Sequence, residues 1–295
     1  MRKSHTFSNI RTRLLIVYLA LTFSLFNIDN FLKSQVYGHD FVPNESASFL
    51  SFANQLQAES ELVQSNLDND NLTLAKEHAT RAIELLNSKD PINNVAWRDE
   101  IAERNQRVAN ELVTAISNLE NITVSPEQQQ SANLSIVEID AILNEAITAR
   151  IEQEQRENST IRALALANLV DSILRNYGDA YDVGFDLTNM SNMAGSSSPM
   201  MMGNDTDGNY SLVNTSDYQS ARALAIKAQE IFESELRSLA PDTATGSIGQ
   251  LENGLIQLID AVNNRASPTE VMMIVHTQVH PSLQSAFNLG LQMQM

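Results

Sequence analysis

Residues 267–289 read SPTEVMMIVHTQVHPSLQSAFNL, a largely apolar helical stretch that carries two of the five histidines in the chain. His276 and His280 are four residues apart, so on a helix they share one face, with Cβ atoms about 5–6 Å apart. Pro281 has no N–H for the carbonyl of Thr277 and its ring crowds that carbonyl, so we expect a bend there. The stretch predicts either a metal site built on two imidazoles or an ordinary core that tolerates two histidines.

The composition of the whole chain favours helices. Only 10 glycines and 7 prolines occur among 295 residues, and aromatic residues make up 6%. Ala, Leu, Ile, Glu and Gln dominate the periodic segments, whereas the β-branched and aromatic residues typical of strands are few. We therefore predict an all-α protein, an antiparallel bundle of about six to eight helices with one long central helix and one long irregular loop.

Helical periodicity outside the opening stretch predicts helices over residues 44–67, 72–87, 94–119, 217–239 and 247–264. Residues 131–177 contain neither proline nor glycine. They are expected to form either one long helix or two helices that break near residues 152–160, EQEQRENST.

The chain divides into an N-terminal helical region, residues 39–183, and a C-terminal helical region, residues 217–295, which we expect to pack together. Residues 184–216 lie between them and are rich in Gly, Ser, Asn, Asp and Met. A loop of this length in a compact domain is usually functional or disordered.

Residues 1–38 resemble an export signal. Several basic residues precede the apolar run at residues 14–26, LLIVYLALTFSLF. This run is shorter than the roughly 20 residues that span a bilayer, as in a signal peptide. The alternative is an uncleaved anchor over residues 14–32. Either reading predicts an extracytoplasmic protein, secreted or anchored to the outer face of the cytoplasmic membrane.

The charge and the absence of cysteine exclude several functions. A net charge of −17 repels nucleic acid and anionic lipid, and it concentrates cations. With no cysteine in the chain, disulfides, cysteine nucleophiles and thiolate metal sites are excluded.

The first metal hypothesis joins His276 and His280 to His78. Periodicity places His78 on the apolar stripe of the 72–87 helix. The carboxylate that orients a ligating histidine would come from Glu77 beside it or from Glu230, Glu233 or Glu235. Three imidazoles from two helices suit copper, zinc or iron. The alternative is that each histidine bonds a backbone carbonyl or water.

A second metal hypothesis rests on thioether sulfur, a soft ligand that suits Cu(I). The 184–216 loop contains five methionines, Met190, Met193, Met200, Met201 and Met202. The alternative is a disordered insertion or an adaptable contact for a partner. Cleavage after Gly38 would also make His39 the amino terminus, whose amine and imidazole together chelate copper. The alternative there is a mobile terminal histidine.

The chain has more N-x-S/T sequons than its composition produces by chance, and sequons on an exported chain predict glycosylation. They begin at Asn44, Asn71, Asn121, Asn133, Asn158, Asn189, Asn204, Asn209 and Asn214. We therefore expect a glycosylated surface protein.

No catalytic motif is visible. The chain has no G-x-S-x-G elbow, no phosphate-binding loop and no H-E-x-x-H motif. The sequence therefore predicts a protein that is not an enzyme.

Two stretches resemble known proteins. Residues 221–262, ARALAIKAQEIFESELRSLAPDTATGSIGQLENGLIQLIDAV, resemble the extracytoplasmic helical domain of iron-permease-type proteins. There an Ala-rich helix ends in a Phe-Glu-x-x-Glu-like stretch. Here that stretch reads Phe232, Glu233, Ser234, Glu235, so the glutamate spacing differs and no ligand is carried over. Residues 37–63 are similar to uncharacterised secreted helical proteins of archaea.

Together these patterns predict an exported, non-enzymatic helical protein that binds a transition metal, copper or iron. The other form of this prediction is an accessory ectodomain that acts in metal uptake or in a copper-dependent membrane system. Its partner would be a membrane protein or complex. The alternative is a glycosylated structural or partner-binding surface protein without a metal.

Overall fold

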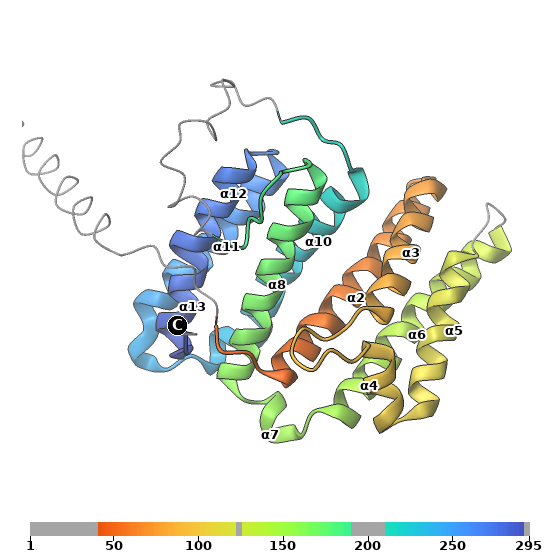
Figure 1. Cartoon of the computed structure of the whole chain (residues 1–295), viewed down its shortest axis with the longest axis horizontal. Helices are drawn as coiled ribbons and strands as arrows, with labels where there is room; N and C mark the ends of the chain where they lie inside the picture. Colours follow the sequence, from red (N-terminus) through yellow and green to blue (C-terminus); the bar gives the residue numbers. More distant parts are fainter. Residues whose placement is uncertain (1–40, 122–125, 190–209, 292–295) are drawn as a thin grey trace, which may run out of the picture. The chain divides into compact units, whose positions relative to one another are not determined.

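The structure is a computed structural model that describes residues 41–121, 126–189 and 210–291 (Figure 1). These ranges contain helices and no strand; their only β-type pairings are isolated bridges from Phe41 to Leu291 and from Lys89 to Ala96. The prediction of an all-α fold is confirmed. None of the described helices is long and apolar enough to cross a membrane, and residues 14–26 lie outside the described ranges.

The first half of the described chain forms α2 (Glu45–Asp68), α3 (Leu72–Asn87), α4 (Trp97–Arg104), α5 (Gln106–Glu120) and α6 (Pro126–Arg150). The expected helix over residues 94–119 is therefore broken. Asn105 has an extended backbone, and its side chain accepts the Val108 N–H at 3.3 Å. An asparagine side chain that accepts backbone N–H groups at the start of a helix holds its own backbone in a non-helical conformation. At Asn105 this conformation ends α4 and starts α5.

The 131–177 segment breaks in the region that the sequence indicated. α6 is followed by the short α7 (Gln153–Arg156) and then by α8 (Ser159–Ala180). Asn158 caps α8, because its side-chain oxygen accepts the N–H groups of Thr160 at 2.9 Å and Ile161 at 3.2 Å. The chain thus has two long helices here, joined by the short α7, in place of one long central helix.

Helix capping also bears on the sequons. Four sequon asparagines are N-cap residues whose side chains accept backbone N–H groups in the first turn of a helix: Asn44, Asn71, Asn158 and Asn214. Asparagine is among the best N-cap residues, and serine and threonine are common beside it. Capping therefore accounts for part of the excess of sequons, whether or not the sites are glycosylated.

The second half forms α10 (Thr215–Ile231), the π-helix η2 (Phe232–Leu236), two 3-10 turns (Arg237–Leu239 and Asp242–Ala244), α11 (Thr245–Asn263), α12 (Pro268–Ile274), the π-helix η5 (Val275–Val279) and α13 (His280–Phe287). The disturbance expected at Pro281 takes the form of η5. The His280 N–H bonds the Val275 carbonyl, five residues back. Single π turns of this kind recur at functional sites.

The buried side chains form two clusters, one on each side of α2. Helices α2 to α6 enclose Phe49, Phe52 and Trp97, whereas α8 and α10 to α13 enclose a second cluster around Tyr177 and Phe232. α2 contacts α3 and α6 and also α8 and α10 (Figure 1). It is therefore the element through which the two clusters meet.

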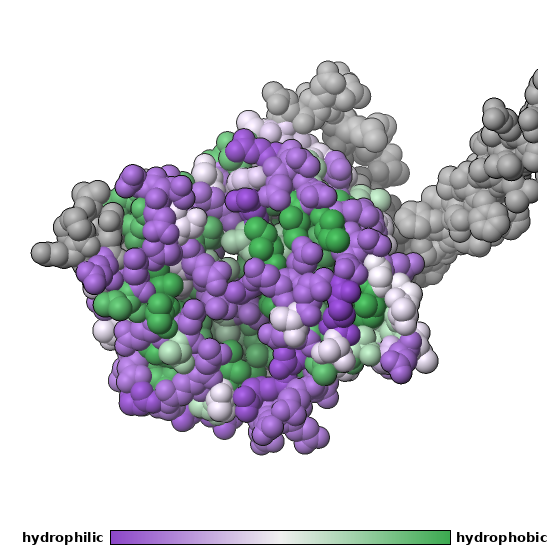
Figure 2. Space-filling view, turned by 180° about the vertical axis from the view of Figure 1, so that it is seen from behind, coloured by the Kyte–Doolittle hydropathy of each residue, from purple (hydrophilic) through white to green (hydrophobic). Residues whose placement is uncertain are grey.

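The surface is largely polar. Figure 2 shows polar residues over most of one face, with apolar residues in several separate patches. Scattered exposed apolar side chains are normal for a folded protein and carry no functional argument by themselves.

Candidate functional site

His78 lies in a buried polar network that spans both clusters. Its side chain is 0% exposed, as the helical periodicity of residues 72–87 indicated. Nδ1 lies 2.7 Å from Oε2 of Glu59 on α2, and Nε2 lies 2.8 Å from Oε1 of Gln219 on α10. Glu77, the neighbour that the sequence suggested, is exposed. Both ring nitrogens of His78 are therefore engaged within the protein.

Glu59 is the centre of this network. Its Oε1 accepts a hydrogen bond from Ser220 at 2.6 Å, and Arg81 forms ion pairs with both Glu59 and Asp217. Burial raises the pKa of Glu59, but the hydrogen bond from His78 and the charge of Arg81 outweigh that effect and hold the pKa below its ordinary value. The network ties α2 and α3 to α10.

Sequence reasoning missed Glu59, although a signal was present. Glu59 follows Leu56 by three residues and precedes Val63 by four, so it lies on the buried stripe of α2. A carboxylate at such a position requires a buried partner.

His276 and His280 come together as their spacing indicated. Their ring centroids are 5.3 Å apart with the planes nearly perpendicular, and the side chains are 3% and 1% exposed. His276 Nε2 lies 3.0 Å from the carbonyl oxygen of Leu187. His280 Nε2 lies 3.4 Å from Asp171 Oδ1, and the Phe41 ring meets His280 edge-on.

The structure does not bring His78 to this pair. Across residues 41–121, 126–189 and 210–291, no three or more His, Asp or Glu side chains are grouped to hold a metal ion. The other candidate ligands lie outside the described residues: His39, Met190, Met193, Met200, Met201 and Met202.

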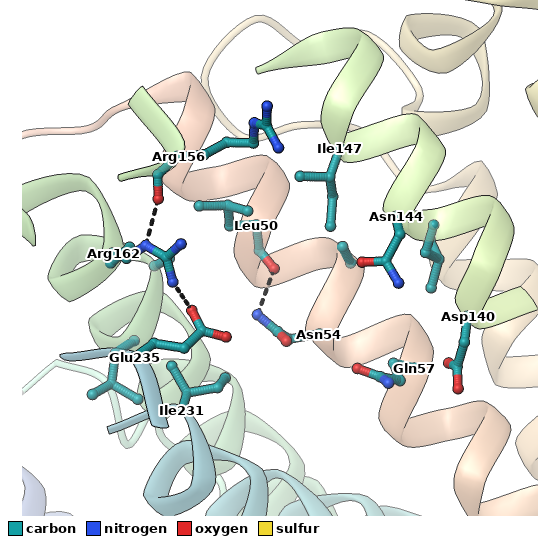
Figure 3. Close-up of a pocket in the computed structure, with 14 residues that line it drawn as sticks. Leu50, Asn54, Gln57, Asp140, Asn144, Ile147, Arg156, Arg162, Ile231 and Glu235 are labelled. Atoms are coloured by element: carbon teal, nitrogen blue, oxygen red, sulfur yellow. Dashed lines mark hydrogen bonds and ion pairs between the residues drawn. The ribbon is translucent and has the colours of Figure 1, made fainter. Parts of the chain in front are cut away.

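A pocket of about 290 Å³ opens where α2, α6, α8 and α10 meet (Figure 3). Positions spaced i, i+3, i+4, i+7 on α2 and on α6 present matching stripes to it. Its lining residues are Leu50, Ala53, Asn54, Gln57, Asp140, Leu143, Asn144, Ile147, Arg156, Arg162, Ala165, Leu166, Ile231 and Glu235.

One end of the pocket is cationic. Arg162 donates a hydrogen bond to the backbone carbonyl of Arg156 and forms an ion pair with Glu235 of η2 (Figure 3). Arg156 differs from Arg162, because its Nε atom is buried and has no hydrogen-bond partner within residues 41–121, 126–189 and 210–291. A buried donor without a partner costs free energy, so a ligand that accepts from it would recover that cost.

The other end is anionic. Asp140 is half-buried on α6, and its Oδ1 atom is buried without a hydrogen-bond partner in the part of the chain that the structure describes. Burial raises the pKa of Asp140, and the nearby charge of Glu61 raises it further, against the opposing effects of Gln57 and Lys227. This end therefore favours a cationic or hydrogen-bond-donating group.

Three amides line the pocket wall: Asn54, Gln57 and Asn144. The Asn54 Nδ2 group donates to the Leu50 carbonyl at 2.9 Å, which leaves its side-chain oxygen as an acceptor. Figure 3 shows Asn144 and Gln57 between the Arg156 end and the Asp140 end. The arrangement can hold a polar molecule by hydrogen bonds along its length.

Comparisons with known proteins add no relative. No family model matches the sequence, and neither the curated proteins nor the solved structures give a significant match. The function must therefore be argued from the chain's own residues.

Proposed function

We propose that the chain is an exported, non-enzymatic binding protein that takes a small polar ligand in the pocket between α2, α6, α8 and α10. The observation that carries this proposal is that two residues lining the pocket, Arg156 and Asp140, each have a buried polar atom, Nε and Oδ1, without a hydrogen-bond partner among the described residues. Buried polar groups are nearly always paired in native proteins, so two exceptions around one cavity indicate a missing partner.

The chemistry of the lining supports binding over covalent catalysis. None of the lining side chains carries a hydroxyl, thiol or imidazole group, the groups that most often act as nucleophile or as its base. Export is supported by the basic and apolar pattern of residues 1–38, which is typical of a signal or anchor segment.

A thermal-shift screen of the purified full chain against small polar molecules tests the proposal. A ligand present at about 100 times its Kd adds about 2.7 kcal/mol to the free energy of unfolding, which raises Tm by several degrees. The stabilising ligand is expected to lose its effect on the R156Q and D140N variants. A screen in which no ligand raises Tm, or in which both variants respond like the wild type, would contradict the proposal.

A transition-metal site is the second candidate, favoured by the two buried imidazoles of His276 and His280, whose ring centroids are 5.3 Å apart. Imidazole nitrogens suit copper, zinc or iron. In this case the chain would serve as an accessory ectodomain in metal uptake or in a copper-dependent membrane system. Metal analysis of untagged protein tests it, because equal metal content in the wild type and in a His276→Ala/His280→Ala double variant would exclude this site.

A further inference from the structure

The pocket between α2, α6, α8 and α10 has opposite charge at its two ends. Arg156 and Arg162 lie at one end, and Arg156 forms no ion pair within the described chain. Asp140 lies at the other end, where Glu61 is close enough to act on its charge. A ligand with a single charge would satisfy one end and leave the other unpaired.

The length of the pocket limits the ligand. Asp140 and Ile147 are seven residues apart on α6, so their Cα atoms are separated by about 10 Å along the helix axis. Arg156 lies beyond Ile147, on α7 (Figure 3). A single α-amino acid carries its amine and carboxylate on one carbon and is too short to meet both ends. A molecule with a spacer of several atoms between the charges has the required length.

The middle of the pocket matches such a spacer. The Asn54 side-chain oxygen and the amides of Gln57 and Asn144 can pair with the N–H and C=O of a peptide group. Leu50 and Ile147 provide apolar wall for small side chains. The volume of about 290 Å³ lies at the lower end of small-molecule pockets, which excludes a large ligand.

We propose that the ligand is a short zwitterion of dipeptide length, with its carboxylate at Arg156 and its ammonium group at Asp140. This inference rests on the proposed function, because it names the ligand class for the same pocket. It extends that function, since a neutral polyol would use the amides and leave both charged ends without partners.

Calorimetric titration of the full chain with alanyl-alanine tests the inference, alongside two blocked forms that each lack one charge. N-Acetylation removes the ammonium group, and amidation removes the carboxylate. Each blocked form is expected to bind about tenfold or more weakly, the effect of losing one hydrogen bond to a charged group. Alanine is expected to bind more weakly as well, because only one carbon separates its charges. In contrast, 5-aminopentanoate is expected to retain binding, because it separates its charges by as many atoms as alanyl-alanine does.

Matched variants assign each end. In the D140N variant, acetylation of the peptide is expected to cause no further loss of affinity. In the R156Q variant, the same is expected of amidation. Two variants outside the pocket serve as controls: D179N, which alters another carboxylate whose pKa burial raises, and R104Q, which alters an exposed arginine of α4. Both controls are expected to discriminate between the peptides as the wild type does.

The possible failures are distinguishable. Blocked peptides that bind as tightly as alanyl-alanine, or D140N and R156Q variants that discriminate like the wild type, would overturn the ligand class. Binding of the neutral sugar trehalose without binding of alanyl-alanine would overturn the ligand class and leave the proposed function standing. Failure of every probe to bind the wild type would overturn both.

Discussion

His78 Nδ1 lies 2.7 Å from Oε2 of Glu59, and this contact between α3 and α2 is almost completely shielded from solvent. Arg81 forms an ion pair with the same carboxylate. Ion pairs in such positions are costly to form but more costly to break, because removal of one partner leaves a buried charge without compensation.

The first prediction concerns this network. E59Q should lower the free energy of unfolding by about 3 kcal/mol, because His78 and Arg81 lose their shared carboxylate. E77Q is the matched control, since Glu77 is exposed on the neighbouring helix and should change stability by less than about 0.5 kcal/mol. Urea unfolding monitored by circular dichroism measures both. Equal midpoints for the two variants would show that the network does not stabilise the fold.

The second prediction is a pH dependence. The pKa of Glu59 is lower in the folded protein than its ordinary value of 4.5, so the folded state binds this proton less tightly than the unfolded state. The stabilisation is therefore present above about pH 4.5 and is lost as the pH falls through the folded-state pKa. The stability difference between wild type and E59Q should shrink between pH 6 and pH 3. A difference that stays constant across this range would contradict the assignment.

The third prediction has the opposite sign. Burial raises the pKa of Asp140, so the folded state binds this proton more tightly and ionised Asp140 opposes folding at neutral pH. D140N should therefore be at least as stable as the wild type at pH 7, and this gain should disappear at low pH, where the wild-type carboxyl is protonated. Loss of stability at pH 7 would mean that the hydrogen bond from Gln57 and the charge of Lys227 outweigh the cost of burying the Asp140 carboxylate.

The fourth prediction separates capping from glycosylation. Asn71 caps α3 by accepting the Leu74 N–H at 3.2 Å, whereas Asn133 is exposed within α6. In protein made without glycosylation, N71A should lower the free energy of unfolding by about 1 kcal/mol. N133A removes a sequon in the same way and should cause no loss, since alanine favours a helix interior. Equal losses for the two variants would refute the capping role.

Local patterns predicted the local structure well. The expected helix over residues 72–87 coincides with α3, and the apolar stripe correctly placed His78 in the interior. The break near residues 152–160 was one of two readings, and the Asn158 cap accounts for it. The capping role of Asn105 was missed, because one asparagine is compatible with both a helix interior and a cap.

Contacts between distant parts of the chain could not be read from these patterns. Glu59 and Gln219 meet at His78 although they are 160 residues apart in the sequence, and helical periodicity carries no information about contacts at that separation. The pocket has the same origin, since Asn54, Asp140 and Arg162 belong to three different helices. Pro281 indicated a disturbance in its helix but gave no sign that it would take the form of a π turn.

The most direct measurement is an experimental structure of the full chain with alanyl-alanine bound. We predict the peptide carboxylate within about 3 Å of Arg156 Nε and the peptide ammonium group at the same distance from Asp140 Oδ1. Water molecules alone on these two atoms, at peptide concentrations that saturate binding in solution, would contradict it.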